Sequence, residues 1–117
     1  MKKNLFLLFL GLSVSSLVQA EIVTTDIVTI ERLFTYDDVG AIEGKEGTDI
    51  VAWMETGIDE CPTGVWLSPS APGYNNMTSF LLAAYMGQKR VRFQVYNDSL
   101  WERSASGVCE IDAIRFE

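Results

Sequence analysis

Histidine is missing from the 117-residue sequence, and only two cysteines and three prolines occur in it. Without histidine the chain lacks the usual general base, the imidazole-dependent nucleophile pairs and the zinc sites that contain an imidazole. Carboxylates remain as groups for catalysis, but most carboxylates of an acidic exported protein lie at its solvated surface. We therefore expect a protein that is not an enzyme and that has no cofactor.

Basic side chains are also scarce, because nine Lys and Arg residues stand against 16 Asp and Glu residues, for a formal net charge of −7. A protein that binds nucleic acid needs a net basic surface, and attraction to anionic lipid needs basic segments. The composition therefore argues against nucleic acid as a partner and against a protein held on lipid by charge.

A long apolar run occurs only at the start of the chain. Lys2 and Lys3 precede the apolar stretch 5–12, and 18–20 (VQA) is a sequence that a signal peptidase accepts. The apolar stretch is shorter than a membrane-spanning helix needs. We expect a signal peptide over 1–20 with cleavage near Ala20, a single domain over 21–117, and a secreted or periplasmic protein without stable membrane insertion.

The two cysteines, Cys61 and Cys109, both follow this expected leader. An even number of cysteines in a small exported domain predicts a disulfide, and a small core gains from one. The bond would close a long loop and restrict the unfolded chain by roughly 4 kcal/mol in the chain-entropy model. Two independent buried thiols are the alternative.

Residue periodicity predicts five strands and one helix. The strands are expected at 21–36, 49–55, 65–68, 90–96 and 107–116, and a turn at 97–99. The first and last strands change the parity of their apolar residues, which indicates bulges. The helical stripe is Met77, Phe80, Leu81, Ala84 and Tyr85, with Asn75 or Asn76 as N-cap and Gly87 as the stop. This order predicts a mainly β, five-stranded, OB-fold-like Greek-key barrel with one helix between strands 3 and 4.

Two groups of side chains combine the aromatic and polar groups that sugar recognition uses. The predicted glycan contacts in and beside the loop after the third strand are Trp66, Ser68, Tyr74 and Asn75. Those on the outward side of the fourth strand and after it are Arg92, Gln94, Tyr96 and Trp101. Packing of the tryptophans in a core or a subunit interface is the alternative. For Arg90 and Arg92 the alternative is a cross-strand ladder with Glu110 and Asp112.

Acidic residues gather in the segment after the first expected strand. They are Asp37, Asp38, Glu43, Glu46 and Asp49. Their spacing does not match the twelve-residue calcium loop, which needs alternating ligands and a closing glutamate. We therefore predict a solvated acidic loop and no metal site.

The stretch 79–95 (SFLLAAYMGQKRVRFQV), followed by Trp101 and a late cysteine, resembles the pentamer-forming B subunits of secreted bacterial toxins. The subtilase cytotoxin and the pertussis-like typhoid toxin are of this type. The segment 61–67 is also similar to one in small secreted bacterial proteins of unassigned function. Where those B subunits have a serine-acidic stretch in the sialoglycan pocket, the comparable region of this chain reads Thr24-Thr25-Asp26.

This resemblance implies an OB-fold, a ring of five copies with the helices around a central pore, and binding of a host glycan or glycoprotein. It also implies a toxin A subunit as a partner. The first function hypothesis is therefore the glycan-binding, receptor-recognition subunit of a bacterial toxin, assembled as a homo-oligomer. The alternative is a periplasmic or secreted protein-interaction domain, either an inhibitor or an assembly partner. A small hydrolase that uses carboxylates ranks last.

Overall fold

The computed structural model describes residues 21–54, 58–59, 61–101 and 107–117. The expected signal peptide over 1–20 lies outside the described residues. The elements are β1 (Ile22–Thr24), β2 (Ile30–Thr35), β3 (Ile50–Met54), β4 (Gly64–Leu67), α1 (Tyr74–Met86), β5 (Val91–Leu100) and β6 (Val108–Phe116). The prediction of a mainly β protein with one helix is confirmed for this part of the chain.

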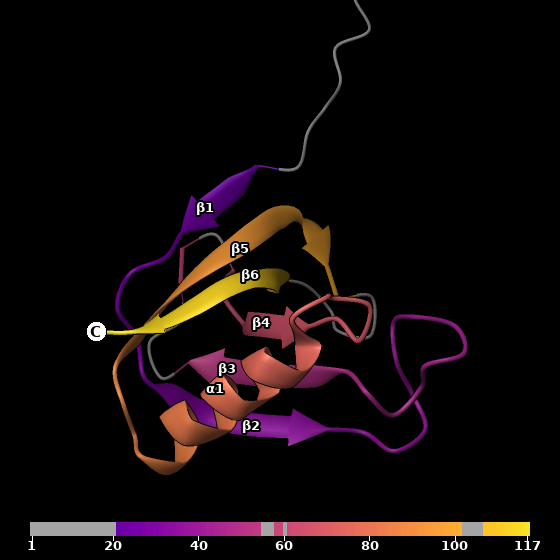
Figure 1. The fold of residues 1–117 in the computed structure, drawn as a ribbon. Coiled ribbons are helices and arrows are strands. Elements are labelled where there is room, and N and C mark those ends of the chain that lie inside the picture. Colours follow the sequence, from indigo (N-terminus) through magenta and orange to yellow (C-terminus); the bar gives the residue numbers. More distant parts are fainter. Residues whose placement is uncertain (1–20, 55–57, 60, 102–106) are drawn as a thin grey trace, which may run out of the picture.

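The six strands form one mixed sheet in the order β1-β5-β6-β4-β3-β2 (Figure 1). Neighbouring strands are antiparallel, except that β4 and β6 are parallel. A parallel pair needs a crossover connection, and α1 and β5 supply it, since both lie between β4 and β6 in the chain. The sheet is not closed, which differs from the predicted barrel.

One extended segment supplies both edge strands, because β1 pairs with β5 whereas β2 pairs with β3. Between the two strands the Thr25 N–H donates to the Phe93 carbonyl at 2.8 Å, and the Phe93 N–H donates to Thr25 Oγ1 at 3.0 Å. Val28 then bridges to Val91, after which β2 begins at Ile30. The prediction of five strands is therefore wrong in number: the expected first strand changes its partner midway and becomes two.

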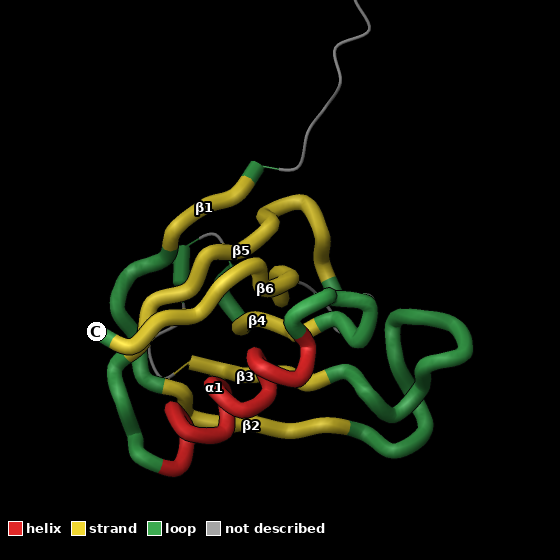
Figure 2. Tube along the Cα trace, viewed as in Figure 1, coloured by secondary structure: helices red, strands yellow, loops and turns green. Residues whose placement is uncertain are grey.

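The helix α1 consequently follows the fourth strand, not the third, and packs against β2, β4 and β6 (Figure 2). Leu81 and Ala84 are buried, and Met77 and Tyr85 are partly buried against the same core. Phe80, however, is 44% exposed. Four of the five residues of the predicted stripe thus face the core.

The helix N-cap lies two or three residues before the predicted caps. Gly73 is the N-cap residue, and its carbonyl accepts a hydrogen bond from the Met77 N–H at 2.9 Å. Asn75 and Asn76, the predicted caps, lie inside the first turn. The stop at Gly87 is confirmed. No side chain caps the helix, and the loop before it contains turns closed by the Ala71 N–H to the Ser68 carbonyl and the Tyr74 N–H to the Ala71 carbonyl.

Two strand predictions change in detail. The segment 97–99, predicted as a turn, belongs to β5, which continues to Leu100. The bulge predicted in the last strand is present, because Gln94 pairs with Ala113 but Val95 pairs with Ile111, which leaves Asp112 as the extra residue. The parity of buried side chains in β6 changes at this point.

The core between α1 and the sheet, here called the helix-side core, is almost wholly aliphatic. Its buried members are Val28, Ile30, Ala52, Met54, Ile58, Cys61, Val65, Leu67, Leu81, Ala84, Val91, Phe93, Val95, Cys109, Ile111 and Ile114. Phe93 is fully buried and is the one aromatic ring among them. Burial of each such side chain contributes roughly 1.5–3 kcal/mol, so this layer dominates the stability of the fold.

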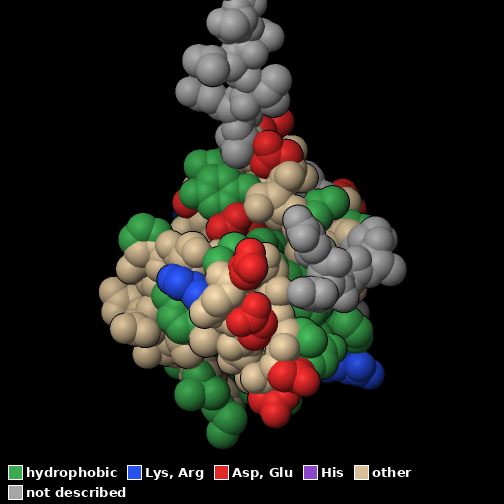
Figure 3. Space-filling view, turned by 90° about the vertical axis from the view of Figure 1, so that its right-hand side faces the viewer, with side chains coloured by type: hydrophobic (Ala, Val, Ile, Leu, Met, Phe, Trp, Pro, Cys, Tyr) green, Lys and Arg blue, Asp and Glu red, His purple; other side chains and the backbone are tan. Residues whose placement is uncertain are grey.

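The acidic composition is visible on the surface. In Figure 3 acidic side chains follow one another down the middle of the face drawn, and basic side chains appear only toward its sides. Apolar side chains lie between them on the same face. This face therefore carries mainly negative charge.

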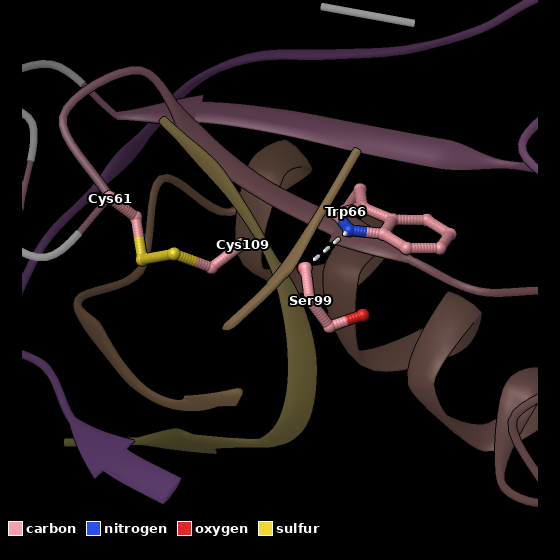
Figure 4. Close-up of a disulfide and its surroundings, with 4 residues drawn as sticks. All are labelled: Cys61, Trp66, Ser99 and Cys109. Carbon is pink, nitrogen blue, oxygen red and sulfur yellow. Dashed lines mark hydrogen bonds between the residues drawn. A yellow bond between two sulfur atoms is a disulfide. The ribbon is translucent and has the colours of Figure 1, made fainter. Parts of the chain in front are cut away.

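The predicted disulfide is confirmed: Cys61 and Cys109 are bonded, with Cα atoms 5.6 Å apart and a sequence separation of 48. It joins the segment before β4 to β6, and both cysteines are fully buried. Figure 4 shows the disulfide on one side of β6 and the Trp66 ring on the other. A disulfide of this kind persists in an oxidising compartment, which agrees with the expected secreted or periplasmic location.

Candidate functional site

A second, smaller core covers the face of the sheet that points away from α1. Side chains alternate between the two faces of a strand, so Val51 points away from the helix-side core that Ala52 joins. Val51 pairs with Phe34 of β2 and with Trp66 of β4. The outer aromatic cluster, as we call it, contains Val51, Trp66, Trp101 and Val108, with Phe34, Ala41 and Trp53 partly buried against it.

A buried carboxylate positions this cluster. Asp49 is only 1% exposed, and its Oδ2 accepts hydrogen bonds from the Ala41 N–H at 2.7 Å and from Trp101 Nε1–H at 2.8 Å. Its Oδ1 has no hydrogen-bond partner within the described residues. Hydrogen bonds to an ionised acceptor are stronger than neutral ones. Asp49 thus joins the loop after β2 to the indole ring of Trp101.

Tyr36 extends the cluster to the surface. Its ring stacks on Trp101, with centroids 6.1 Å apart and planes 17° apart. It also meets the ring of Phe34 edge-on at 5.8 Å. Tyr36 is 46% exposed, so an accessible ring is held in place by buried ones.

An open groove of about 410 Å³ lies beside these rings. The aromatic groove, as we call it, is lined by Arg32, Leu33, Phe34, Tyr36, Trp53 and Tyr85. Phe34 meets Trp53 edge-on at 5.3 Å, and the guanidinium carbon of Arg32 lies 5.2 Å from the Trp53 ring centroid. That distance is within the range of a cation–π interaction. The groove therefore combines aromatic faces with a cation.

Gly64 makes room for the Trp53 ring. The two residues are partners across β3 and β4, and a Cβ atom at Gly64 would lie 2.9 Å from Trp53 Cδ1 and 2.2 Å from the Ala52 carbonyl oxygen. No described residue accepts a hydrogen bond from Trp53 Nε1, which is buried. Unpaired buried donors are uncommon in proteins.

A second hollow, of about 250 Å³, lies where the loop before α1 meets β5 and β6. Its lining residues are Ser70, Ala71, Pro72, Gly73, Met77, Tyr96, Glu110, Ile111 and Asp112. The Tyr96 hydroxyl donates to Asp112 Oδ1 at 2.6 Å, and Ser99 Oγ donates to Glu110 Oε1 at 2.6 Å. The hydrogen bond to Asp112, followed by burial and by the charges of Asp112 and Glu110, raises the pKa of Tyr96. Both carboxylates thus already accept hydrogen bonds from hydroxyl groups of the protein.

Two of the predicted glycan contacts, Trp66 and Trp101, are members of the outer aromatic cluster and are each 4% exposed. Trp66 Nε1–H donates to the Ser99 carbonyl at 3.2 Å (Figure 4). Packing in a core, the alternative that the sequence left open, accounts for both rings. A sugar would reach either face only if the cluster opened.

The other predicted glycan contacts near the start of α1 do not form a shared exposed surface. Ser68 is 4% exposed, and its Oγ accepts a hydrogen bond from the Ser70 N–H at 3.1 Å. Tyr74 is half-buried and donates its hydroxyl hydrogen to the Thr48 carbonyl. Asn75 is exposed on α1. Of these side chains, only Asn75 is both exposed and without a described role in packing.

Arg92 lies opposite Arg115 of β6, and its ion-pair partner is Glu117, with Arg92 Nε 3.8 Å from Glu117 Oε2. The ladder with Glu110 and Asp112 that the sequence offered as an alternative is not the arrangement found. Glu110 instead pairs with Tyr96, Asp112 is the extra residue of the bulge, and both line the second hollow. Gln94 shares a small hollow of about 40 Å³ with both arginines. The structure thus brings together Arg92 with Gln94, and Tyr96 with the loop before α1.

The sequence prediction missed the aromatic groove. Its signal is the alternation of Arg32, Phe34 and Tyr36, which places these side chains on one face of an extended segment. Trp53 lies on the next strand, and only the register of β2 against β3 shows that it joins them. None of these residues was among the predicted contacts.

The predicted acidic loop divides into buried and exposed parts. Asp49 is buried, whereas Asp37, Asp38 and Glu43 are exposed. In the part of the chain that the structure describes, no three His, Cys, Asp or Glu side chains are grouped so that they could hold a metal ion. No helix among the described residues has the length and apolar character required to cross a membrane.

Comparison with known proteins gives no match to this chain among family models, curated proteins or solved structures. The candidate ligand sites of this chain are the aromatic groove, the second hollow and the arginines of β5 and β6.

Proposed function

We propose that this chain is a secreted, non-enzymatic binding module whose aromatic groove holds a carbohydrate. The observation that carries the proposal is the groove itself, in which the rings of Phe34, Tyr36 and Trp53 surround an opening beside the Arg32 guanidinium. The apolar C–H face of a pyranose packs on an aromatic ring, while an arginine donates to hydroxyl or acidic groups. Ligand sites in general are apolar hollows with a few placed polar groups.

The strand order supports a finer proposal, that the fold is an OB-fold. When β1 and β2 are counted as one bent strand, the helix follows the third strand and the sheet has the order of a five-stranded Greek-key barrel. OB-folds bind oligosaccharides over their second and third strands and the loops beside them. In this chain the second strand would be β3, which carries Trp53, and the loop after the first strand begins at Tyr36.

A narrower form of the proposal comes from the resemblance of 79–95 to toxin B subunits. In this form the module is the receptor-recognition subunit of a toxin, binds a host glycoprotein, forms a ring of five copies and associates with an A subunit. The ring would multiply the affinity of a weak single site through avidity.

The test of the groove is glycan binding by the exported chain and by two variants. Arg32→Ala removes the cation and Tyr36→Ala removes the most exposed ring of the groove. Because both side chains are exposed, the fold should persist. We expect each variant to bind at least tenfold more weakly to any glycan that the unaltered chain captures on an array, which corresponds to about 1.4 kcal/mol.

Phe116→Ala is the matched control, since Phe116 is a 42% exposed aromatic residue outside the groove lining. Its glycan affinity should equal that of the unaltered chain. An array without any bound glycan would reject the carbohydrate proposal. Equal losses in all three variants would reject the groove as the site.

The second candidate function is a protein-interaction domain, and one observation favours it. Phe80, Leu82 and Met86 of α1 are 44%, 54% and 73% exposed, and Phe116 stacks on Phe80 with centroids 5.5 Å apart. Leu82 and Met86 are four residues apart and share one side of α1, whereas Phe80 lies with Phe116 on another side. Exposed apolar side chains that lie together are typical of interaction surfaces. A partner protein or a second copy of the chain would cover them.

Light scattering distinguishes this candidate when self-association is measured for Leu82→Glu and Met86→Glu. Leu100→Glu is the control, because Leu100 is 47% exposed on β5 rather than on the helix. A lower mass for the two helix variants alone would support an interface on α1. A monomer mass for the unaltered chain at all concentrations would count against self-association and against the ring.

A further inference from the structure

Arg92 and Arg115 lie directly opposite each other in the ladder of β5 and β6. Like charges at directly opposed positions destabilise a sheet. The pair is conspicuous in a chain with nine basic and 16 acidic residues. Figure 1 shows the end of β6 beside the start of β5, which is where this pair lies. Two of the few cationic side chains therefore lie side by side, and an anion between them would offset their repulsion.

A glutamate of the same chain partly supplies that anion. Arg115 Nε donates to Glu117 Oε2 at 2.7 Å, whereas Arg92 Nε is 3.8 Å from the same oxygen. The Glu117 N–H donates to the Arg90 carbonyl at 3.0 Å, which keeps the carboxylate beside the pair. The hydrogen bond from Arg115, assisted by the charges of Arg115, Arg92 and Arg90, lowers the pKa of Glu117. One carboxylate oxygen thus serves two guanidinium groups.

Arg92 retains an unpaired donor in this arrangement. Its Nε is buried and has no hydrogen-bond partner within the described residues. The small hollow beside it, of about 40 Å³, is also lined by Thr24, Gln94 and Arg115. Thr24 and Gln94 are further hydrogen-bond donors, and each guanidinium suits two-point contact with an oxyanion. Two guanidinium groups and two neutral side chains that can donate therefore line the hollow, together with Phe93, Ala113 and Ile114.

We propose that Arg92 and Arg115 form a binding site for an oxyanion, a carboxylate or a sulfate group of a ligand, which replaces the Glu117 carboxylate between them. Glu117 is the resident acceptor, and it keeps the two positive charges compatible while the site is empty of ligand. Because the side chains of Arg115 and Arg92 are 62% and 30% exposed, an oxyanion can approach both from solvent, and it would reach the buried Arg92 Nε only by displacing the Glu117 carboxylate. The site lies on β5 and β6 and does not depend on the aromatic groove.

The test is a titration of the ¹⁵N-labelled exported chain with sodium sulfate and, separately, with sodium acetate, each against sodium chloride at equal ionic strength. The arginine Nε–Hε signals are followed by NMR. We expect the signals of Arg92 and Arg115 to move together and to saturate with one dissociation constant. Arg32 is the internal control, because it lies in the aromatic groove. The stronger of the two anions identifies a sulfated or a carboxylated ligand.

Two variants separate the parts of the proposal. Glu117→Gln removes the resident anion, so its affinity for the better anion should rise at least threefold. Arg92→Gln keeps a polar side chain but removes the charge, and its affinity should fall about tenfold or more, the usual loss for a charge-assisted hydrogen bond. The backbone spectrum of each variant shows directly whether it is folded.

Several results would overturn the proposal. Signals of all three arginines that move equally and without saturation would mean that the anion acts only by screening charge. An affinity in Glu117→Gln equal to that of the unaltered chain would show that Glu117 does not occupy the site. Unaltered binding by folded Arg92→Gln would remove Arg92 from it.

Discussion

The two faces of the sheet are built from different side chains. The helix-side core is aliphatic except for Phe93 and contains the disulfide, whereas the outer aromatic cluster contains Trp66 and Trp101. Aliphatic side chains need only space and neighbours. An indole also needs an acceptor for its N–H, and here the acceptors are the Ser99 carbonyl and the Asp49 carboxylate. The outer face therefore depends on a backbone acceptor in β5 and on the Asp49 carboxylate just before β3.

This difference determines which face of the sheet can bind a ligand. A close-packed aliphatic layer under a helix exposes side chains only at its margins, as with Leu33 and Tyr85 in the aromatic groove. The one helix among the described residues lies on the opposite face, and Trp53 and Tyr36 remain partly exposed at the margin of the outer cluster. Buried aromatic rings hold exposed ones in position, and the aromatic groove is the result.

The largest effect should come from the disulfide of the helix-side core. We expect the double substitution Cys61→Ala and Cys109→Ala to lower the free energy of unfolding by about 4 kcal/mol, because the cross-link restricts the unfolded chain. Urea unfolding under oxidising conditions measures it. The unaltered chain with reductant is the control and should lose a similar amount. A double variant as stable as the oxidised chain would show that the cross-link contributes nothing to the helix-side core.

The next effect should come from the polar tie of the outer face. Asp49→Ala removes the acceptor of both the Ala41 N–H and Trp101 Nε1–H, and we expect a loss of about 1.5–3 kcal/mol in the free energy of unfolding. Asp49→Asn retains an oxygen acceptor and should lose clearly less. Denaturant unfolding followed by tryptophan fluorescence compares the two. Equal losses would mean that the charge, not the hydrogen bonding, is what the cluster requires.

The exposed stack at the margin should contribute less. Tyr36→Ala removes the ring that stacks on Trp101, and we expect a loss of about 0.5–1.5 kcal/mol in the free energy of unfolding. Tyr36→Phe keeps the ring and should remain near the stability of the unaltered chain. Thermal or urea unfolding of both variants checks this. A phenylalanine variant as unstable as the alanine variant would assign the effect to the hydroxyl.

The smallest effect concerns Tyr96, which belongs to neither core. The hydrogen bond to Asp112 raises the pKa of Tyr96 above its ordinary value, so the folded state favours the protonated phenol. This stabilisation is complete below about pH 10, the ordinary tyrosine pKa, and is lost as the pH rises through the folded-state pKa. Because Tyr96 is partly exposed to solvent, Tyr96→Phe should cost only about 0.5 kcal/mol at pH 8.

Urea unfolding of the two chains between pH 8 and pH 11 measures this dependence. The difference between the unaltered chain and Tyr96→Phe should shrink as the pH increases. Tyr36→Phe serves as the comparison, because the contacts of Tyr36 with the described residues are made by its ring and not by its hydroxyl. A difference that is constant over the whole range would disconnect Tyr96 from Asp112.

Part of the site was predictable from alternation alone. The outward positions of Arg92, Gln94 and Tyr96 follow from the strict alternation in β5, and the structure has them on that side. Their partners were not predictable, because parity indicates a bulge in the last strand but not its pairing, and because the ladder shifts again between Tyr96 and Leu100. A one-residue shift changes every later neighbour across the ladder, and nothing local in the sequence specifies its size.

The sequence by itself determined the features that depend on neighbouring residues. Periodicity identified the strands and the helix, since side-chain direction repeats every two residues in a strand and every 3.6 in a helix. The two cysteines permitted one disulfide within the chain, which the structure contains. The tertiary structure decided the remainder. It divided the first extended segment between two sheet edges, buried Trp66 and Trp101, and left Trp53 and Tyr36 at the surface. Alternation indicates that a strand has two faces, but which face a helix covers depends on contacts between residues far apart in the chain, whose register is a property of the folded molecule.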